Sequence, residues 1–204
     1  MKKIRPTLRN KANKKWSGHG TANTQYLGMT HLCTWLYFYF KMRPTNETMN
    51  IAIEIGSHMG EGLQMLASTG LFNKIHVIEP FRGEEEFNEM FGWSWDEVRA
   101  EWELNTRHFK DIIKLHESYS YEIADNFIDG TIDFVYIDGE HSYEAVKRDI
   151  ELYLPKIKDG GIIAGHDYHE SWPGVIKAVE EVLGKPNHVH RDSTWVHKVD
   201  RSNV

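Results

Sequence analysis

The sequence predicts a doubly wound α/β fold, in which a mostly parallel sheet carries helices on both faces. Short apolar runs without polar alternation are typical of parallel strands buried on both faces, and such runs recur along the chain. Segments with the apolar spacing of helices separate most of these runs. The last two runs are joined only by Arg191-Asp192-Ser193, which indicates a hairpin. Five β-α units closed by a hairpin therefore predict one α/β domain with right-handed crossovers.

Apolar spacing and the residues that end each segment place the individual elements. Residues 24–42 are predicted to form a helix, and 49–55 the first strand. A glycine-rich turn and a short helix follow, and Gly70 ends this helix because glycine readily adopts the left-handed conformation found there. The charged, tryptophan-rich segment 81–110 is predicted to be helical, either as a lid over a substrate or as an insert anchored by its tryptophans. The other predicted elements are strands at 74–79, 112–116, 132–137, 161–164, 187–190 and 194–199, and helices at 119–127, before Pro155, and from near Pro173 to Gly184.

Length and composition predict one domain with a basic N-terminal arm. A chain of 204 residues is long enough for one well-buried domain and short for two. Residues 1–23 are rich in lysine and arginine, which predicts a flexible arm, or alternatively an arm that contacts an anionic partner or a neighbouring subunit. We expect 24–204 to form a single domain. Its N-terminal helical segment, 24–48, is expected to pack its aromatic residues on the sheet or on a second copy of the chain.

The charge, the single cysteine and the lack of a long apolar run exclude several classes of protein. A formal net charge of −6 disfavours nucleic acid as the main partner. Cys33 is the only cysteine, so no internal disulfide can form, which fits a reducing compartment. The N-terminus lacks the apolar core of a signal peptide, and the longest apolar stretch, 32–40, is shorter than the ~20 residues of a spanning helix. The sequence therefore predicts a cytoplasmic protein without a membrane partner.

A glycine-rich turn after the first strand predicts a ligand site. Glycines at such a turn let a ligand approach the backbone closely, and here they follow Glu54. They are Gly56, Gly60 and Gly62, and their order, G-x-x-x-G-x-G, differs from the G-x-G-x-x-G of dinucleotide-binding folds. Glu79 ends the second strand, where a carboxylate can accept hydrogen bonds from ribose hydroxyls. Together these residues favour an adenosine site, although the glycines could serve packing alone and Glu79 could simply be solvated.

Two later strands end in residues that can hold a metal ion or a proton. The fourth predicted strand ends at Asp138, and His141 follows three residues later. His166 and Asp167 follow the fifth strand. Ligands of open α/β sheets sit beyond the carboxyl ends of strands, and adjacent strands lie about 4.8 Å apart, so Asp138, His166 and Asp167 can converge on one cation. His141 is the candidate general base, because histidine is mostly neutral at physiological pH. Alternatively, His141 caps the next helix and the His-Asp pair is part of a plain turn.

These motifs together resemble class I S-adenosylmethionine-dependent methyltransferases. Within that class the chain is most similar to the branch of macrocin-type sugar O-methyltransferases and cephalosporin-hydroxylase-like proteins. The resemblance implies a Rossmann-like sheet of seven strands with a reversed last strand. It covers 49–199 and rests on Glu54-x-Gly56-x-x-x-Gly60, Glu79, Ser118-Tyr119-Ser120, Asp138-Gly-Glu-His141-Ser-Tyr143 and Gly160-Gly161-x-x-Ala164-Gly165-His166-Asp167-Tyr168.

The resemblance also implies S-adenosylmethionine as the cofactor and assigns residues to it. Glu54, Gly56 and Ser57 would line its methionine and ribose part. Glu79 would hold the ribose hydroxyls, while Tyr119 and Ser120 would border the adenine. The complete implied set is Glu54, Gly56, Ser57, Gly60, Gly62, Glu79, Ser118, Tyr119, Ser120 and Asp138.

The implied activity is methyl transfer to a hydroxyl of a sugar-like or polyhydroxylated small molecule. An alcohol is a weak nucleophile at neutral pH, and a divalent metal can lower the pKa of a hydroxyl. Asp138 and Asp167 match metal ligands of the resembling enzymes, and His141 matches their base. His166 stands where those enzymes often have an acid, so the ion could be Mn²⁺ or another transition metal rather than Mg²⁺, or the site could be weak or absent.

Two other functions remain open from the sequence. One is a cofactor-binding module that has lost catalysis and uses its aromatic N-terminal helix for assembly. The other is an NAD-dependent oxidoreductase, which the order of the glycines disfavours.

Overall fold

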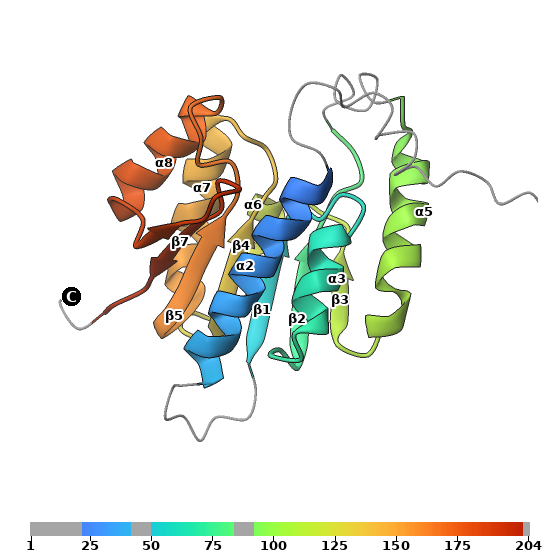
Figure 1. Cartoon of the computed structure of the whole chain (residues 1–204), viewed down its shortest axis with the longest axis horizontal. Helices are drawn as coiled ribbons and strands as arrows, with labels where there is room; N and C mark the ends of the chain where they lie inside the picture. Colours follow the sequence, from blue (N-terminus) through green and yellow to red (C-terminus); the bar gives the residue numbers. More distant parts are fainter. Residues whose placement is uncertain (1–21, 42–49, 84–91, 202–204) are drawn as a thin grey trace, which may run out of the picture.

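The computed structural model describes residues 22–41, 50–83 and 92–201, and it shows one sheet with helices on both faces (Figure 1). The basic arm predicted at 1–23 lies outside the described residues except for its last two positions. Parts of the predicted segments 24–48 and 81–110 also lie outside them.

A seven-stranded sheet forms the centre of the molecule. Its strands are β1 (Ile51–Ile55), β2 (Lys74–Ile78), β3 (Ile113–His116), β4 (Ile132–Ile137), β5 (Ile157–Gly165), β6 (His188–Val189) and β7 (Trp195–Lys198). They follow the order β3-β2-β1-β4-β5-β7-β6. The first five strands are parallel, and β7 is antiparallel to both β5 and β6. The predicted mostly parallel, doubly wound sheet with an antiparallel C-terminal hairpin is therefore confirmed.

Helices cover the two faces of this sheet in two separate layers. The helices are α2 (Ala22–Lys41), α3 (Glu61–Ser68), α5 (Trp95–Thr106), α6 (Ser120–Ile123), α7 (Tyr143–Tyr153) and α8 (Pro173–Leu183). One hydrophobic cluster joins α2, α3 and α5 to one face. A second cluster joins α6, α7 and α8 to the other face, as the layers in Figure 1 show.

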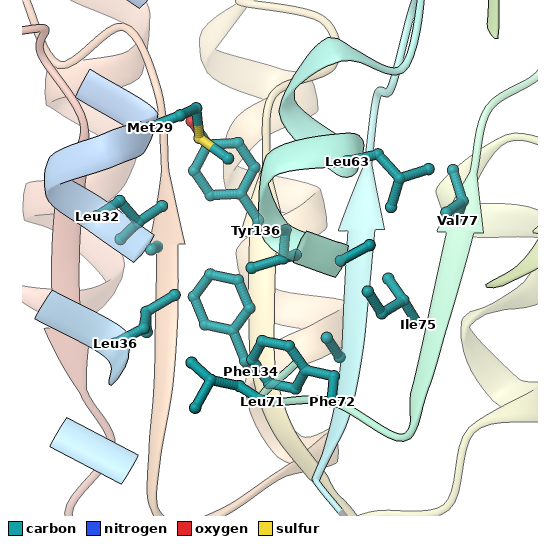
Figure 2. Close-up of a cluster of buried hydrophobic side chains, with 14 of the residues drawn as sticks. Met29, Leu32, Leu36, Leu63, Leu71, Phe72, Ile75, Val77, Phe134 and Tyr136 are labelled. Atoms are coloured by element: carbon teal, nitrogen blue, oxygen red, sulfur yellow. The ribbon is translucent and has the colours of Figure 1, made fainter. Parts of the chain in front are cut away.

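The strands are buried on both faces, which explains their continuous apolar runs. All six residues of β4 are buried. Figure 2 shows Met29, Leu32 and Leu36 of α2 beside Phe134 and Tyr136 of β4, and Leu63 of α3 beside Val77 of β2. Leu32 and Leu36 of α2 have no exposed surface, and burying each leucine contributes about 1.5–3 kcal/mol to stability. Aromatic residues of α2 divide between the two environments, since Phe40 is buried and Phe38 is 58% exposed.

The fifth strand begins earlier than the sequence predicts. β5 starts at Ile157 rather than at 161, because Gly160 and Gly161 belong to the strand and not to a turn before it. The pairing of β4 with β5 shifts its register between Ile132 and Phe134. A Cβ on Gly161 would lie 2.5 Å from Cγ2 of Ile157, so this irregularity needs glycine there.

The strand order reverses between β1 and β4, and this is the place where open α/β sheets bind ligands. The backbone N–H of Asp138, just beyond β4, donates to the carbonyl of Ile55 at the end of β1 over 2.8 Å. Within the described ranges, no helix is both long and apolar enough to cross a bilayer.

Candidate functional site

The turn after β1 packs directly against the end of β4. Gly56 has a φ of +79°, which favours glycine, and its N–H donates to the carbonyl of Ile78 over 3.0 Å. A Cβ on Gly56 would lie 2.3 Å from the carbonyl oxygen of Asp138. The glycine turn and the first acidic strand end are therefore in direct contact at the carboxyl edge of the sheet.

Glu79, at the end of β2, holds this turn through its carboxylate. Its Oε2 accepts hydrogen bonds from the backbone N–H groups of Ser57 (2.9 Å) and His58 (2.8 Å), and its Oε1 accepts one from Phe81 (2.9 Å). Burial raises the pKa of Glu79, although these three N–H donors work in the opposite direction. A carboxylate offers about four acceptor positions, so Glu79 keeps room for about one further donor. Binding of both ribose hydroxyls by Glu79 stays a prediction.

Glu54 lies buried in β1, two residues before Gly56 of the glycine turn. It is only 2% exposed, and its Oε2 has no hydrogen-bond partner among the described residues. Burial raises the pKa of Glu54 to about 8, even though a hydrogen bond from the Ser57 side chain lowers it. Gly62 and Met29 lie beside it, since a Cβ on Gly62 would lie 3.5 Å from Oε1 of Glu54 and 3.6 Å from the Met29 methyl. A buried, half-satisfied carboxyl group of this kind is suited to a cationic or hydroxyl donor.

Helix α5 forms the outer wall of the glycine turn, a role that the sequence did not reveal. The indole N–H of Trp102 donates to Oγ of Ser57 over 3.0 Å, and the Asn105 side chain donates to the carbonyl of Met59 over 2.9 Å. A Cβ on Gly60 would lie 2.9 Å from the indole of Trp102. The described part of 81–110 thus includes a helix packed on the turn. The signal for this contact was the shared helical face of Trp102 and Asn105, three residues apart.

The residues predicted to border the adenine already have other partners within the protein. Oγ of Ser120 donates to Asp149 over 2.5 Å, and Oγ of Ser118 donates to Glu122 over 2.6 Å. The ring of Tyr119 stacks on Tyr121 with centroids 5.5 Å apart, and the guanidinium of Arg82 lies 5.1 Å from its centroid. Burial raises the pKa of Asp149 to about 6 despite the bond from Ser120. The adenine-binding role of this turn stays a prediction.

Three donors from the ends of β4 and β5 converge beyond the sheet. Each of Asp138, His141 and Asp167 offers one ligand atom, and these atoms all lie within 4.8 Å of one another. Nε2 of His141 lies 2.7 Å from Oδ2 of Asp167, and the imidazole stacks on the indole of Trp172 with centroids 4.5 Å apart. Burial raises the pKa of Asp138, while the nearby histidines lower it. Two carboxylate oxygens and one imidazole nitrogen are a donor set that suits a divalent transition metal.

His166 lies beside this group and contacts three carboxylates. Its Nδ1 is 3.3 Å from Asp167 and 3.9 Å from Asp138, and its Nε2 is 3.6 Å from Asp192. Burial disfavours its charge, but the hydrogen bonds to Asp167 and Asp192 prevail and raise the pKa of His166 to about 11. The same histidine contacts hold the pKa of Asp167 below its usual range, against the effect of burial. The converging set thus contains His141, whereas the sequence predicted His166; the role of His166 as a ligand stays a prediction.

The sequence matches a known family over residues 53–168, and this family is described as a methyltransferase domain. The match spans more than half of the chain and includes the last three residues of β1, the glycine turn and both acidic strand ends. The chain belongs to this methyltransferase family. The match confirms the methyltransferase family that the sequence motifs indicated, and the specific branch stays a prediction.

Two curated relatives resemble parts of this methyltransferase. The uncharacterized protein R132 of Acanthamoeba polyphaga mimivirus is 29% identical over 140 residues, which cover 64% of this chain and 58% of the relative. The uncharacterized protein y4gI of Sinorhizobium fredii is 24% identical over 119 residues, which cover 56% of this chain and 13% of the relative. The matched region therefore spans 58% of the length of one relative and 13% of the other.

Solved structures share the fold of this methyltransferase. One is an O-methyltransferase from Bacillus cereus in complex with S-adenosylhomocysteine, with 15% identity, a TM-score of 0.59, and coverage of 95% of this chain and 89% of that chain. Another is CalS11, a TDP-rhamnose 3'-O-methyltransferase of calicheamicin biosynthesis, with 17% identity, a TM-score of 0.55, and coverage of 85% and 79%. At such identities the likeness concerns the fold.

The residues of the glycine turn fit S-adenosylmethionine chemically. The cofactor carries an ammonium group, a sulfonium and ribose hydroxyls, and all but the sulfonium are hydrogen-bond donors. Glu54 offers the buried oxygen Oε2, which has no hydrogen-bond partner among the described residues, and Glu79 retains about one acceptor position. Gly62 lies beside Oε1 of Glu54, and Gly56 lets the turn approach the backbone of Asp138 closely.

Proposed function

We propose that this methyltransferase transfers the methyl group of S-adenosylmethionine to a hydroxyl oxygen, with a divalent cation held by Asp138, His141 and Asp167. The observation that carries the proposal is the convergence of these three donors within 4.8 Å. Their position next to the glycine turn supports it, because the backbone of Asp138 touches both Gly56 and the end of β1. A methyl donor on one wall of the crevice would then face an acceptor bound at the other.

In this reaction the carbon–sulfur bond breaks as a carbon–oxygen bond forms, S-adenosylhomocysteine leaves, and the acceptor hydroxyl releases its proton to water. The chain must align donor and acceptor, and such alignment can supply a large part of the rate enhancement. Asp138, Asp167 and His141 would hold the cation, which would lower the pKa of an acceptor hydroxyl when bound. Trp172 stacks on His141 and is 42% exposed, so it fixes the imidazole plane and offers a flat apolar face at the entrance.

The acceptor is proposed to be a sugar-like or polyhydroxylated small molecule. Two neighbouring hydroxyls could approach one cation together, which suits a site built from few protein ligands. Structural similarity to CalS11, which acts on TDP-rhamnose, supports this choice of acceptor class. A flat indole face beside the site, such as that of Trp172, also suits the apolar face of a sugar ring.

A metal-free variant of the same reaction is favoured by one specific contact. Nε2 of His141 lies 2.7 Å from Oδ2 of Asp167, which is the distance of a charge-assisted hydrogen bond. In this arrangement Asp167 would orient the imidazole, and His141 would accept the acceptor proton as a general base. The two arrangements exclude each other at Nε2, because one nitrogen cannot bind a metal and donate to Asp167 at once.

The test compares metal binding and turnover in the full chain. Metal-stripped protein is titrated with Mn²⁺ by calorimetry, and transfer of a labelled methyl group to a panel of nucleotide sugars is then measured with and without Mn²⁺. We expect one Mn²⁺ per chain, loss of this heat in Asp138→Asn, and an unchanged heat in the exposed control Asp125→Asn. Metal-independent turnover that disappears in His141→Ala would favour the general-base arrangement. Binding of S-adenosylhomocysteine without methylation of any hydroxyl acceptor would count against O-methyl transfer.

A further inference from the structure

Three histidines come together where α2 meets the C-terminal hairpin, and none of them belongs to the site described above. His188 lies in β6, His190 follows that strand, and His31 lies in α2. The imidazole centroids of His188 and His190 are 4.3 Å apart, and those of His190 and His31 are 6.3 Å apart. Two elements that are far apart in the sequence therefore bring their imidazoles side by side.

The register of the hairpin explains why both histidines of the β6 segment face α2. His188 pairs with Val196 of β7, and paired residues of neighbouring strands lie on the same face of a sheet. Val196 belongs to the hydrophobic cluster that includes α2. The N–H of His190 donates to the carbonyl of Thr194 over 2.8 Å, so the pairing continues to this residue. Because side chains alternate along a strand, His190 shares the face of His188, while Val189 between them lies on the other.

The imidazole of His190 has a buried nitrogen without a partner. Its Nε2 is buried and makes no hydrogen bond to any described residue. A buried polar atom in this state is costly unless an ion or a water molecule meets it. Burial lowers the pKa of His190, and His188 and His31 also lower it, whereas Asp192 raises it. Neutral imidazole is the form that binds metal ions, so His190 is in the protonation state that a ligand needs.

We propose that His31, His188 and His190 form a binding site for a divalent transition-metal ion such as Zn²⁺, which links α2 to the β6–β7 hairpin. Three neutral imidazoles suit Zn²⁺, Ni²⁺ or Cu²⁺, whereas Mg²⁺ and Ca²⁺ prefer oxygen ligands. The site shares no residue with the proposed catalytic cation site at the ends of β4 and β5. It therefore does not depend on the proposed reaction.

The separations of the rings are close to those around a single ion. With Zn–N bonds of about 2.0–2.1 Å in tetrahedral geometry, two bound imidazoles have their centroids roughly 5 Å apart. The observed separations of 4.3 and 6.3 Å lie about 1 Å to either side of this value. Among the described residues, only the donors at the ends of β4 and β5 already lie within 4.8 Å of one another, so the histidines must turn to close on an ion. His31 and His188 are exposed, and exposed side chains change rotamer readily.

The test titrates Zn²⁺ into the full chain by calorimetry, in an Asp138→Asn background that disables the proposed catalytic cation site. Each of the three histidines is replaced in turn by glutamine. The matched control is His108→Gln, because His108 is also exposed but precedes β3, which forms the opposite edge of the sheet from β6. Thermal unfolding without metal shows whether each variant is folded.

We expect the Asp138→Asn protein to bind one Zn²⁺, and each of His31→Gln, His188→Gln and His190→Gln to weaken this binding by about 10-fold or more, since each removes one ligand. His108→Gln should leave the affinity unchanged. Zn²⁺ should also raise the midpoint of thermal unfolding, because it binds the folded chain. This rise should be smaller in the three variants than in the control.

Several results would overturn the inference. One is that the Asp138→Asn protein binds no Zn²⁺, and another is that the three variants bind it as tightly as the control. A loss in His188→Gln and His190→Gln but not in His31→Gln would mean that the ion binds the hairpin alone, and the link to α2 would be wrong. If Asp138→Asn does not fold, the same substitutions in the wild type should each lower the number of bound Zn²⁺ ions by one, and an unchanged number would refute the site. Failure of O-methyl transfer would leave all these expectations as they are.

Discussion

Replacing Glu54 with glutamine should make the ligand-free protein less sensitive to alkaline pH and weaken cofactor binding. Burial raises the pKa of Glu54 from 4.5 to about 8 in the folded protein. Below pH 4.5 the group is protonated in both the folded and the unfolded chain, so it adds no pH dependence. Between pH 4.5 and about pH 8 only the unfolded chain loses the proton, so the free energy of unfolding falls as pH rises. This loss levels off above about pH 8, where the folded chain is ionised as well. Glutamine does not titrate, and Glu54→Gln removes this loss.

The expected size follows from the interval between the two pKa values. At about 1.4 kcal/mol per pH unit, the loss between pH 5 and pH 8 is at most about 4 kcal/mol. Structural relaxation and water entry will reduce this figure. The amide of glutamine also leaves an N–H group unpaired next to Ser57, at a constant cost of about 1–3 kcal/mol. Glu54→Gln should therefore be less stable than the wild type at pH 5, and the difference should shrink or change sign at pH 8.5.

Urea unfolding of both proteins at pH 5, 7 and 8.5 measures this effect, with and without S-adenosylhomocysteine. Ligand at 100 times the Kd should stabilise the wild type by about 2.7 kcal/mol, and Glu54→Gln by clearly less at the same concentration. The free energies of unfolding without ligand should converge or cross as pH rises. Parallel curves for the two proteins would show that Glu54 does not titrate between pH 5 and pH 8.5, and the account of the buried carboxyl group would be wrong.

The remaining predictions concern packing. Gly56→Ala should destabilise the protein by more than about 3 kcal/mol, the combined order of magnitude of backbone strain and overpacking, because its Cβ would lie 2.3 Å from the Asp138 carbonyl oxygen. The control Gly130→Ala also has a positive φ but no atom within 4 Å of the added Cβ, so it should cost only about 1 kcal/mol. Equal losses of unfolding free energy in urea would contradict the close contact at Gly56. Ile150→Ala, at a fully buried position of α7, should lower the free energy of unfolding by about 2–5 kcal/mol, whereas Ile128→Ala, at a position 75% exposed, should change it by no more than about 0.5 kcal/mol. Similar urea midpoints for the two variants would refute the assigned buried face of α7.

Much of the fold was predictable from the sequence because the strands are buried on both faces. β4 reads as an uninterrupted apolar run apart from Asp133, and its predicted bounds agree with the structure. Asp133 is tolerated there because it accepts a hydrogen bond from the N–H of Ile51 and pairs with Lys158. The start of β5 was mistaken because two glycines resemble a turn in sequence but serve a register shift in the sheet.

The sequence identified the residues that gather at the candidate metal site, but not which histidine lies with the two carboxylates. Strand ends place Asp138 and Asp167 together whatever the side chains do, because β4 and β5 are neighbours. His166 lies beside both carboxylates and also contacts Asp192 from the β6–β7 hairpin, whereas Nε2 of His141 lies closer to Asp167. A contact across about 25 residues of chain has no local sequence signal. The same holds for Glu79, whose partners are backbone N–H groups that every residue possesses.

The electrostatics of the crevice link stability to ligand binding. Burial raises the pKa of Glu54, Glu79 and Asp138, so the ligand-free protein holds acidic groups that resist ionisation. Both proposed ligands are cationic: the cofactor carries a sulfonium and an ammonium group, and the metal carries two charges. Each would favour ionisation of the acid that it meets, and each would thereby release protons on binding. Cofactor and metal should consequently stabilise the fold most at neutral to alkaline pH, where the uncompensated acids destabilise the ligand-free protein most.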